Sequence, residues 1–190
     1  ESRLLLGNSE VYDRFSQLMR GLIEKRGPAM AGESVAERRK ERLEYGETVY
    51  LLEPNLKRSR GGLRDIHLLR WLWYLKQGVA DPDRLHDMGV VSKFDHRRLM
   101  SAQNFLLRVR NEMHFHANEA RDALSRAEQL RLAEYLKYTG KQGMLPVEQF
   151  MRDYFHHTAH VWRMVHRLSE VMQPVSRMDR IFEPMLGRKV

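Results

Sequence analysis

The segment from residue 53 to residue 66, Glu-Pro-Asn-Leu-Lys-Arg-Ser-Arg-Gly-Gly-Leu-Arg-Asp-Ile, combines a flexible backbone with concentrated positive charge. Gly61 and Gly62 directly precede an apolar helical pattern, and a backbone without Cβ atoms allows close approach of a ligand. A helix start adds unpaired N–H groups and a partial positive charge. Lys57 and Arg64 add a point charge and a bidentate donor. These features predict a phosphate-binding corner at Lys57, Gly61, Gly62 and Arg64; the alternative interpretation is a Gly-Gly turn with solvated cations.

The positive charge of the whole chain is concentrated in this region. The 190 residues carry 33 Lys and Arg against 25 Asp and Glu, a net charge of +8. Between residues 57 and 70 five cations face one acid, so this window holds 5 − 1 = +4, half of the surplus. Elsewhere acids and bases are interleaved, as on a solvated helical surface. A hydrophobic content of 42% excludes a disordered chain.

The sequence gives less support for catalytic or metal-binding residues. The chain has no cysteine, which excludes disulfides, thiolate metal sites and a cysteine nucleophile. No carboxylate pair is expected to serve a two-metal site, so we assign no catalytic and no metal-binding residue to this chain. His156 and His160 are spaced like ligands on one helix, but packing or solvation at the bundle surface is the favoured interpretation over a metal site. The three tryptophans are interpreted as core residues: Trp71, Trp73 and Trp162.

Hydrophobic spacing predicts mostly helices. One helix begins at Asn8 or Ser9 and ends at Gly27-Pro28, and a highly charged, mostly solvated helix follows from Ser34 to about Tyr45. Residues 48–52 are β-branched and apolar and form the only expected extended segment. Residues 63–76 are apolar nearly all round, which is typical of a central, buried helix. Further helices are expected near 84–88 and over 92–120, 125–138 and 146–172.

These elements predict an all-α fold, a helical bundle with long antiparallel helices and one short extended segment near 48–52. We expect residues 1–172 to form one helical domain and residues 173–190 to form a tail that leads toward a downstream domain. No apolar run is long enough to span a membrane, and the first residues do not form a signal peptide. We therefore expect a cytoplasmic fragment of a longer protein.

Three stretches resemble the bacterial protein-PII uridylyltransferases, the bifunctional uridylyltransferase/uridylyl-removing enzymes. The first joins Glu53-Pro54-Asn55-Leu56-Lys57 to Gly61-Gly62-Leu63-Arg64-Asp65-Ile66, and a looser form is similar to glutamine synthetase adenylyltransferases. The second runs from Phe105 through Arg110, His114 and Arg121-Asp122 to Leu124 and Gln129. The third is Phe150-Met151-Arg152-Asp153-Tyr154-Phe155. The resemblance covers about residues 3–172, in collinear order.

The resemblance implies a helical domain that follows a nucleotidyltransferase domain and precedes a phosphohydrolase (HD) domain and small-molecule-sensing domains. The implied reaction transfers UMP from UTP, with Mg²⁺, to a tyrosine of the PII nitrogen-signalling protein. The catalytic carboxylates are expected outside this chain, so the fragment alone should be inactive. Lys57 and Arg64 are then expected to neutralise the triphosphate beside Gly61 and Gly62. Three residues are expected to shape the loop: Glu53, Asn55 and Asp65.

The sequence departs from the family pattern at Arg58-Ser59-Arg60, which makes the loop more basic. The alternative hypothesis is a non-catalytic helical module that binds a protein or nucleic acid through its basic face. The resemblance itself implies PII and the protein's own neighbouring domains as partners, with no nucleic acid and no membrane.

Overall fold

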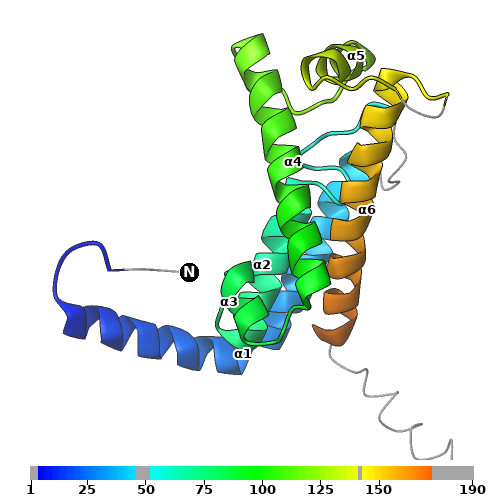
Figure 1. Ribbon diagram of the computed structural model, residues 1–190. Coiled ribbons are helices and arrows are strands. Elements are labelled where there is room, and N and C mark those ends of the chain that lie inside the picture. Colours follow the sequence, from blue (N-terminus) through cyan, green and yellow to red (C-terminus); the bar gives the residue numbers. More distant parts are fainter. Residues whose placement is uncertain (1–3, 46–51, 141–142, 173–190) are drawn as a thin grey trace, which may run out of the picture.

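The computed structural model describes residues 4–45, 52–140 and 143–172, and these residues form an all-α bundle, as predicted (Figure 1). Within them lie the helices α1 (Ser9–Tyr45), α2 (Leu63–Gln77), α3 (Pro82–Asp87), α4 (Lys93–Ala117), α5 (Arg126–Tyr135) and α6 (Pro146–Met172). The described residues contain one isolated antiparallel bridge, between Asn55 and Ala123, and no strand. The predicted extended segment lies outside them except for Leu52, and so does the predicted tail.

Helix α2 is the buried centre of the bundle, as its sequence predicted. It packs against α1, α6 and α4. Its apolar residues are buried on several sides, among them Leu63, Ile66, Leu69, Leu72 and Trp73. Gly78 ends the helix in the left-handed conformation, with its N–H donating to the carbonyl of Tyr74.

Helices α4 and α6 lie side by side and run in opposite directions (Figure 1). The predicted seam of α4 is buried throughout: Leu99, Ala102, Leu106, Val109 and Met113. The seam of α6 buries Tyr154, Thr158, Val161 and Val165. Ser92 and Ser125 cap α4 and α5, because their side chains accept hydrogen bonds from the backbone N–H groups of residues 95 and 128. The helix start expected at Ser34 is wrong, since Ser34 lies inside α1.

The predicted break at Gly27-Pro28 is wrong, since α1 continues through both residues. A proline inside a helix removes one backbone hydrogen bond. Tertiary packing compensates, because α1 crosses the end of α2 so closely that a Cβ on Gly27 would lie 3.3 Å from the carbonyl oxygen of Leu75. The absence of a Cβ at Gly27 lets the two helix backbones lie close together without a tight contact.

Two other expectations about buried side chains are wrong. Trp71 is 59% exposed, because it lies on the side of α2 that no described helix covers. The first part of α1 projects from the bundle (Figure 1), and the apolar residues predicted to share its buried face are mostly exposed, Ile23 excepted. None of the described helices is long and apolar enough to cross a membrane.

Candidate functional site

The loop before α2 is held by backbone pairing with the segment before α5. The N–H of Leu56 donates to the carbonyl of Asp122 at 2.8 Å, and the N–H of Leu124 donates to the carbonyl of Pro54 at 2.8 Å. Leu56 and Leu124 are fully buried beside this pairing. The first and second sequence motifs, far apart in the chain, therefore meet at this point.

The loop also closes on itself. The side-chain oxygen of Asn55 accepts hydrogen bonds from the N–H groups of Lys57 and Arg58, at 3.1 and 2.8 Å. The N–H of Asn55 donates to the hydroxyl of Ser59 at 2.8 Å. Glu53 reaches outward instead, and its carboxylate accepts a hydrogen bond from the N–H of Arg126 at 2.9 Å. Local asparagine bonds of this kind fix a turn without regular secondary structure.

The two glycines are buried against the chain's own backbone. Gly61 has φ +75°, and a Cβ there would overlap the backbone of Thr158 in α6. A Cβ on Gly62 would lie 2.7 Å from the carbonyl oxygen of Leu56. Close approach thus occurs between the loop, α6 and α2. A nucleotide contact at Gly61 or Gly62 stays a prediction that this geometry does not test.

Asp65 forms a buried ion cluster beneath the loop. Its side chain has no exposed surface, and Oδ1 lies 2.8 Å from Nε of Arg38 and 3.3 Å from Nη1 of Arg42. Oδ2 accepts a hydrogen bond from the N–H of Gly61 at 2.6 Å. The Nη2 atom of Arg38 also donates to the carbonyl of Arg58 at 2.8 Å. Asp65 thereby ties α1, α2 and the loop together.

The cations nearer the surface surround this cluster. The carboxylate of Glu41 lies 3.3 Å from Arg38, 3.5 Å from Arg58 and 3.8 Å from Arg64. The side chain of Arg64 is 46% exposed, so its pairing with Glu41 is weak. The ammonium group of Lys57 has no ion-pair partner among residues that the structure describes. Lys57 and Arg64 are therefore the members of the predicted corner whose charges remain accessible.

His67 lies among positive charges on the side of α2 that carries Arg64 and Arg70. Partial burial lowers the pKa of its imidazole, and the charges of Arg64, Arg70, Lys57 and Arg110 lower the pKa further. A groove of about 540 Å³ lies between α2 and α1 on this side, and its walls include Arg64 and His67. We call the surface formed by Lys57, Arg64, His67 and Arg70 the basic face.

Asp122 joins the end of α4 to the loop. One carboxylate oxygen lies 2.6 Å from Nε of Arg110 and 3.1 Å from Nε2 of His114. Burial alone would raise the pKa of the Asp122 carboxyl, but the hydrogen bonds from Arg110 and His114 outweigh it and lower the pKa below its usual value. Three residues of the second motif, Arg110, His114 and Asp122, therefore form one spatial cluster.

Residues of α6 pack in the core and contact arginines of α1 and of the loop. Phe150 and Tyr154 of the third motif are buried in the core, and burial raises the pKa of the Tyr154 hydroxyl. The guanidinium groups of Arg42 and Arg60 lie 4.5 and 3.8 Å from the ring centre of Trp162. These cation–π contacts hold Arg60 against α6. Arg60 belongs to the loop segment Arg58-Ser59-Arg60, which differs from the family pattern.

The histidines and acids do not form a metal site within the described ranges, where no three His, Asp or Glu side chains could hold an ion. His160 is buried, contrary to the predicted surface position, and burial lowers its pKa. The sequence does contain one Asp-x-Asp spacing, Asp81 and Asp83, that the expectation of no carboxylate pair overlooked. Asp81 caps α3, and Asp83 lies 2.7 Å from His96.

Sequence reasoning missed the roles of Arg38 and Arg42, because a helix dense in mixed charge was expected to be solvated. A signal was present. Both arginines continue the spacing of the buried residues Ile23, Gly27 and Ala31 along α1. Steps of four and seven place all five on one side of the helix, so the arginines lie where apolar residues normally pack.

Sequence comparisons relate the chain to known proteins. The chain is 33% identical over 156 residues to bifunctional uridylyltransferase/uridylyl-removing enzymes of Bradyrhizobium diazoefficiens, Rhodospirillum rubrum and Rhodopseudomonas palustris. Each match covers 82% of this chain and 17% of the relative, so the chain spans about a sixth of the length of these proteins. No solved structure matches. The sequence model of the GlnD PII-uridylyltransferase family matches residues 30–169, and the chain belongs to this family.

Proposed function

We propose that this chain is the helical domain of a nucleotidyltransferase that transfers UMP from UTP to a tyrosine of the PII signalling protein. The tyrosyl oxygen would displace pyrophosphate at the α-phosphorus, on carboxylates supplied outside this chain. The described residues provide no metal cluster, so Mg²⁺, proposed for the full-length protein, is assigned to none of them. This chain's contribution is the basic face, with Lys57 and Arg64 directed at the triphosphate.

The observation that carries this proposal is the placement of cations around His67: Arg64 and His67 line one groove, and Arg70 and His67 line a neighbouring hollow. Burial is the largest cause of the lowered pKa of His67, and the charges of Arg64, Arg70 and Lys57 lower it further; these positive charges favour a bound anion. Lys57 supplies a compact charge and Arg64 a planar donor suited to phosphate oxygens. Gly61 contributes by allowing the loop to pack against α6, and Gly62 by allowing the loop to close on its own carbonyl groups.

Two pairs of variants of the full-length protein test the proposal. Lys57→Ala and Arg64→Ala should each weaken binding of Mg–UTP about tenfold, because each removes a charge-assisted phosphate contact. Arg39 and Lys40 are exposed on α1, do not line the groove beside the basic face, and serve as controls with the same change of charge. Titration calorimetry measures affinity, and the initial rate of UMP transfer to PII measures turnover.

Equal affinities for all four variants would overturn the phosphate role of the basic face. The alternative, a non-catalytic module that binds protein or nucleic acid, predicts a different pattern. In that case the protein would bind RNA or DNA with an affinity that falls steeply with salt, and Lys57→Ala would weaken that binding instead.

A further inference from the structure

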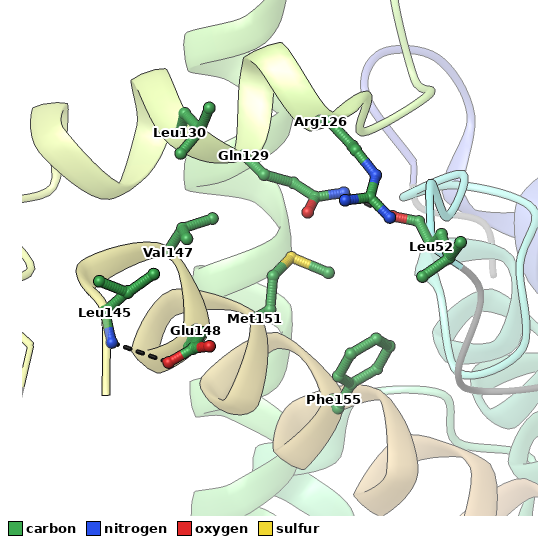
Figure 2. Close-up of a pocket in the computed structure, with 9 residues that line it drawn as sticks. All are labelled: Leu52, Arg126, Gln129, Leu130, Leu145, Val147, Glu148, Met151 and Phe155. Atoms are coloured by element: carbon green, nitrogen blue, oxygen red, sulfur yellow. Dashed lines mark hydrogen bonds between the residues drawn. The ribbon is translucent and has the colours of Figure 1, made fainter. Parts of the chain in front are cut away.

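A second concave site lies between α5 and α6, apart from the basic face. It is a pocket of about 400 Å³ that opens to solvent (Figure 2). Its walls are mainly apolar and include Leu130, Val147 and Met151. Volumes of about 300–1,000 Å³ with a few directed polar groups are typical of small-molecule sites. The polar groups of this pocket therefore decide what it can bind.

Arg126 supplies the positive charge among the described residues that line the pocket. It is the first residue of α5, and its backbone N–H donates to Glu53 at 2.9 Å. Its guanidinium group forms no ion pair with any residue in the described ranges. The carboxylate of Glu53 offsets the positive end of the helix dipole at this point. The guanidinium group of Arg126 gives the pocket one positive edge.

Gln129 lies beside Arg126 and is held rigidly. Its amide nitrogen donates to the carbonyls of Leu52 and Leu124, at 2.6 and 2.9 Å, which uses both amide hydrogens. At the other wall the carboxylate of Glu148 accepts a hydrogen bond from the N–H of Leu145 at 2.8 Å (Figure 2). The pocket is therefore positive at the Arg126 edge, negative at the Glu148 edge, and apolar between them.

We propose that this pocket binds a small monoanion with an uncharged apolar body, such as a medium-chain carboxylate. The carboxylate pairs with Arg126, and the body packs against Leu130, Val147 and Met151. A second negative charge in the body would meet the apolar walls or Glu148, so dianions are excluded. A neutral molecule of the same shape gains the apolar contacts but leaves the guanidinium without a partner.

Methyl NMR on the intact protein, labelled with ¹³C-methyl methionine, tests this proposal with octanoate as the probe. The resonance of Met151 is assigned by its loss in Met151→Leu. Octanoate should shift it saturably, and octanol, with the same tail, should bind about tenfold more weakly because it lacks the charge. Arg126→Gln should weaken octanoate binding about tenfold, whereas Arg126→Lys should retain most of it.

Arg97→Gln is the matched control, since Arg97 is exposed on α4 and does not line the pocket. It should leave octanoate affinity unchanged. Equal effects of Arg126→Gln and Arg97→Gln would overturn the proposal, as would equal affinity for octanol and octanoate. An unmoved Met151 resonance would also overturn it, because the pocket would then be closed to ligands in the intact protein. None of these outcomes depends on UMP transfer.

Discussion

Asp65→Asn is the substitution that most directly tests how the loop is held. The change preserves the shape of the side chain and removes its negative charge. In the native chain this carboxylate is fully buried and lies within 3.3 Å of two buried arginines, Arg38 and Arg42. The amide group of asparagine presents a donor on one side, which would face either a guanidinium or the N–H of Gly61.

The expected cost follows from these contacts. Removing one partner of a buried ion pair destabilises a protein by about 3–5 kcal/mol, because the other charge remains buried. Glu41 still lies 3.3 Å from Arg38, and two loop carbonyls still accept hydrogen bonds from it, so part of the compensation remains. We therefore expect a loss at the lower end of that range, about 3 kcal/mol, and a melting temperature roughly 6–12 °C lower.

Urea denaturation of the wild-type chain and of Asp65→Asn measures this loss. Asp87→Asn is the matched control, since Asp87 is exposed on α3 and has no ion-pair partner among the described residues. The control should change the free energy of unfolding by less than about 0.5 kcal/mol. A loss of under about 1 kcal/mol for Asp65→Asn would refute the ion cluster as the anchor of the loop.

A double-mutant cycle separates the pair from the individual side chains. Arg38→Met should be destabilising alone, because it removes the contacts with Asp65 and with the loop carbonyls. Combined with Asp65→Asn it should cost less than the sum, with a coupling energy of about 1–3 kcal/mol. Additive losses would mean that the two side chains act independently, in conflict with their 2.8 Å contact.

Three further predictions concern the surroundings of the cluster. Gly61→Ala should lower the free energy of unfolding by more than about 3 kcal/mol, because Gly61 has a positive φ and its Cβ would overlap α6. Gly89 has φ +73° but lies in open space, so Gly89→Ala should lower it by only about 1 kcal/mol, as measured by thermal unfolding. The pKa of His67, followed by NMR, should rise toward 6.5 in Arg64→Gln, since one of the charges that lower it is gone. Asp122→Asn should cost about 1–2 kcal/mol at pH 7. Because the folded-state pKa of Asp122 lies below its usual value of 3.8, its stabilisation is present above that pH, and the difference from wild type should shrink in unfolding curves below it.

The bundle itself could be predicted from periodicity. The helices expected over 92–120, 125–138 and 146–172 correspond to α4, α5 and α6. The continuity of α1 could not be predicted, because Gly27-Pro28 is locally a helix-ending signal. Only the neighbouring end of α2, which lies 48 positions further along the chain at Leu75, makes a continuous helix favourable there.

The candidate site was only partly predictable. Sequence reasoning located the loop and its cations. It could not foresee that the backbone of Thr158 in α6 lies against Gly61, since nothing local indicates it. The partners of Asp65 were likewise hidden, because a buried arginine and a solvated one have the same local sequence. Long-range packing decides between them.

Asp65→Asn also tests the proposed nucleotide role, because its effect on the position of the loop and its effect on the net charge predict opposite changes in nucleotide affinity. The substitution makes the chain more positive by one charge, so a purely electrostatic basic face would bind Mg–UTP more tightly. If Asp65 fixes the loop that carries Lys57, and the start of α2 that carries Arg64, the same substitution should weaken binding, since a mobile loop loses conformational entropy on binding. Weaker binding in the more positive variant would therefore show that the buried acid positions the cations above it. Tighter binding would show that the fold beneath the basic face contributes only its charge.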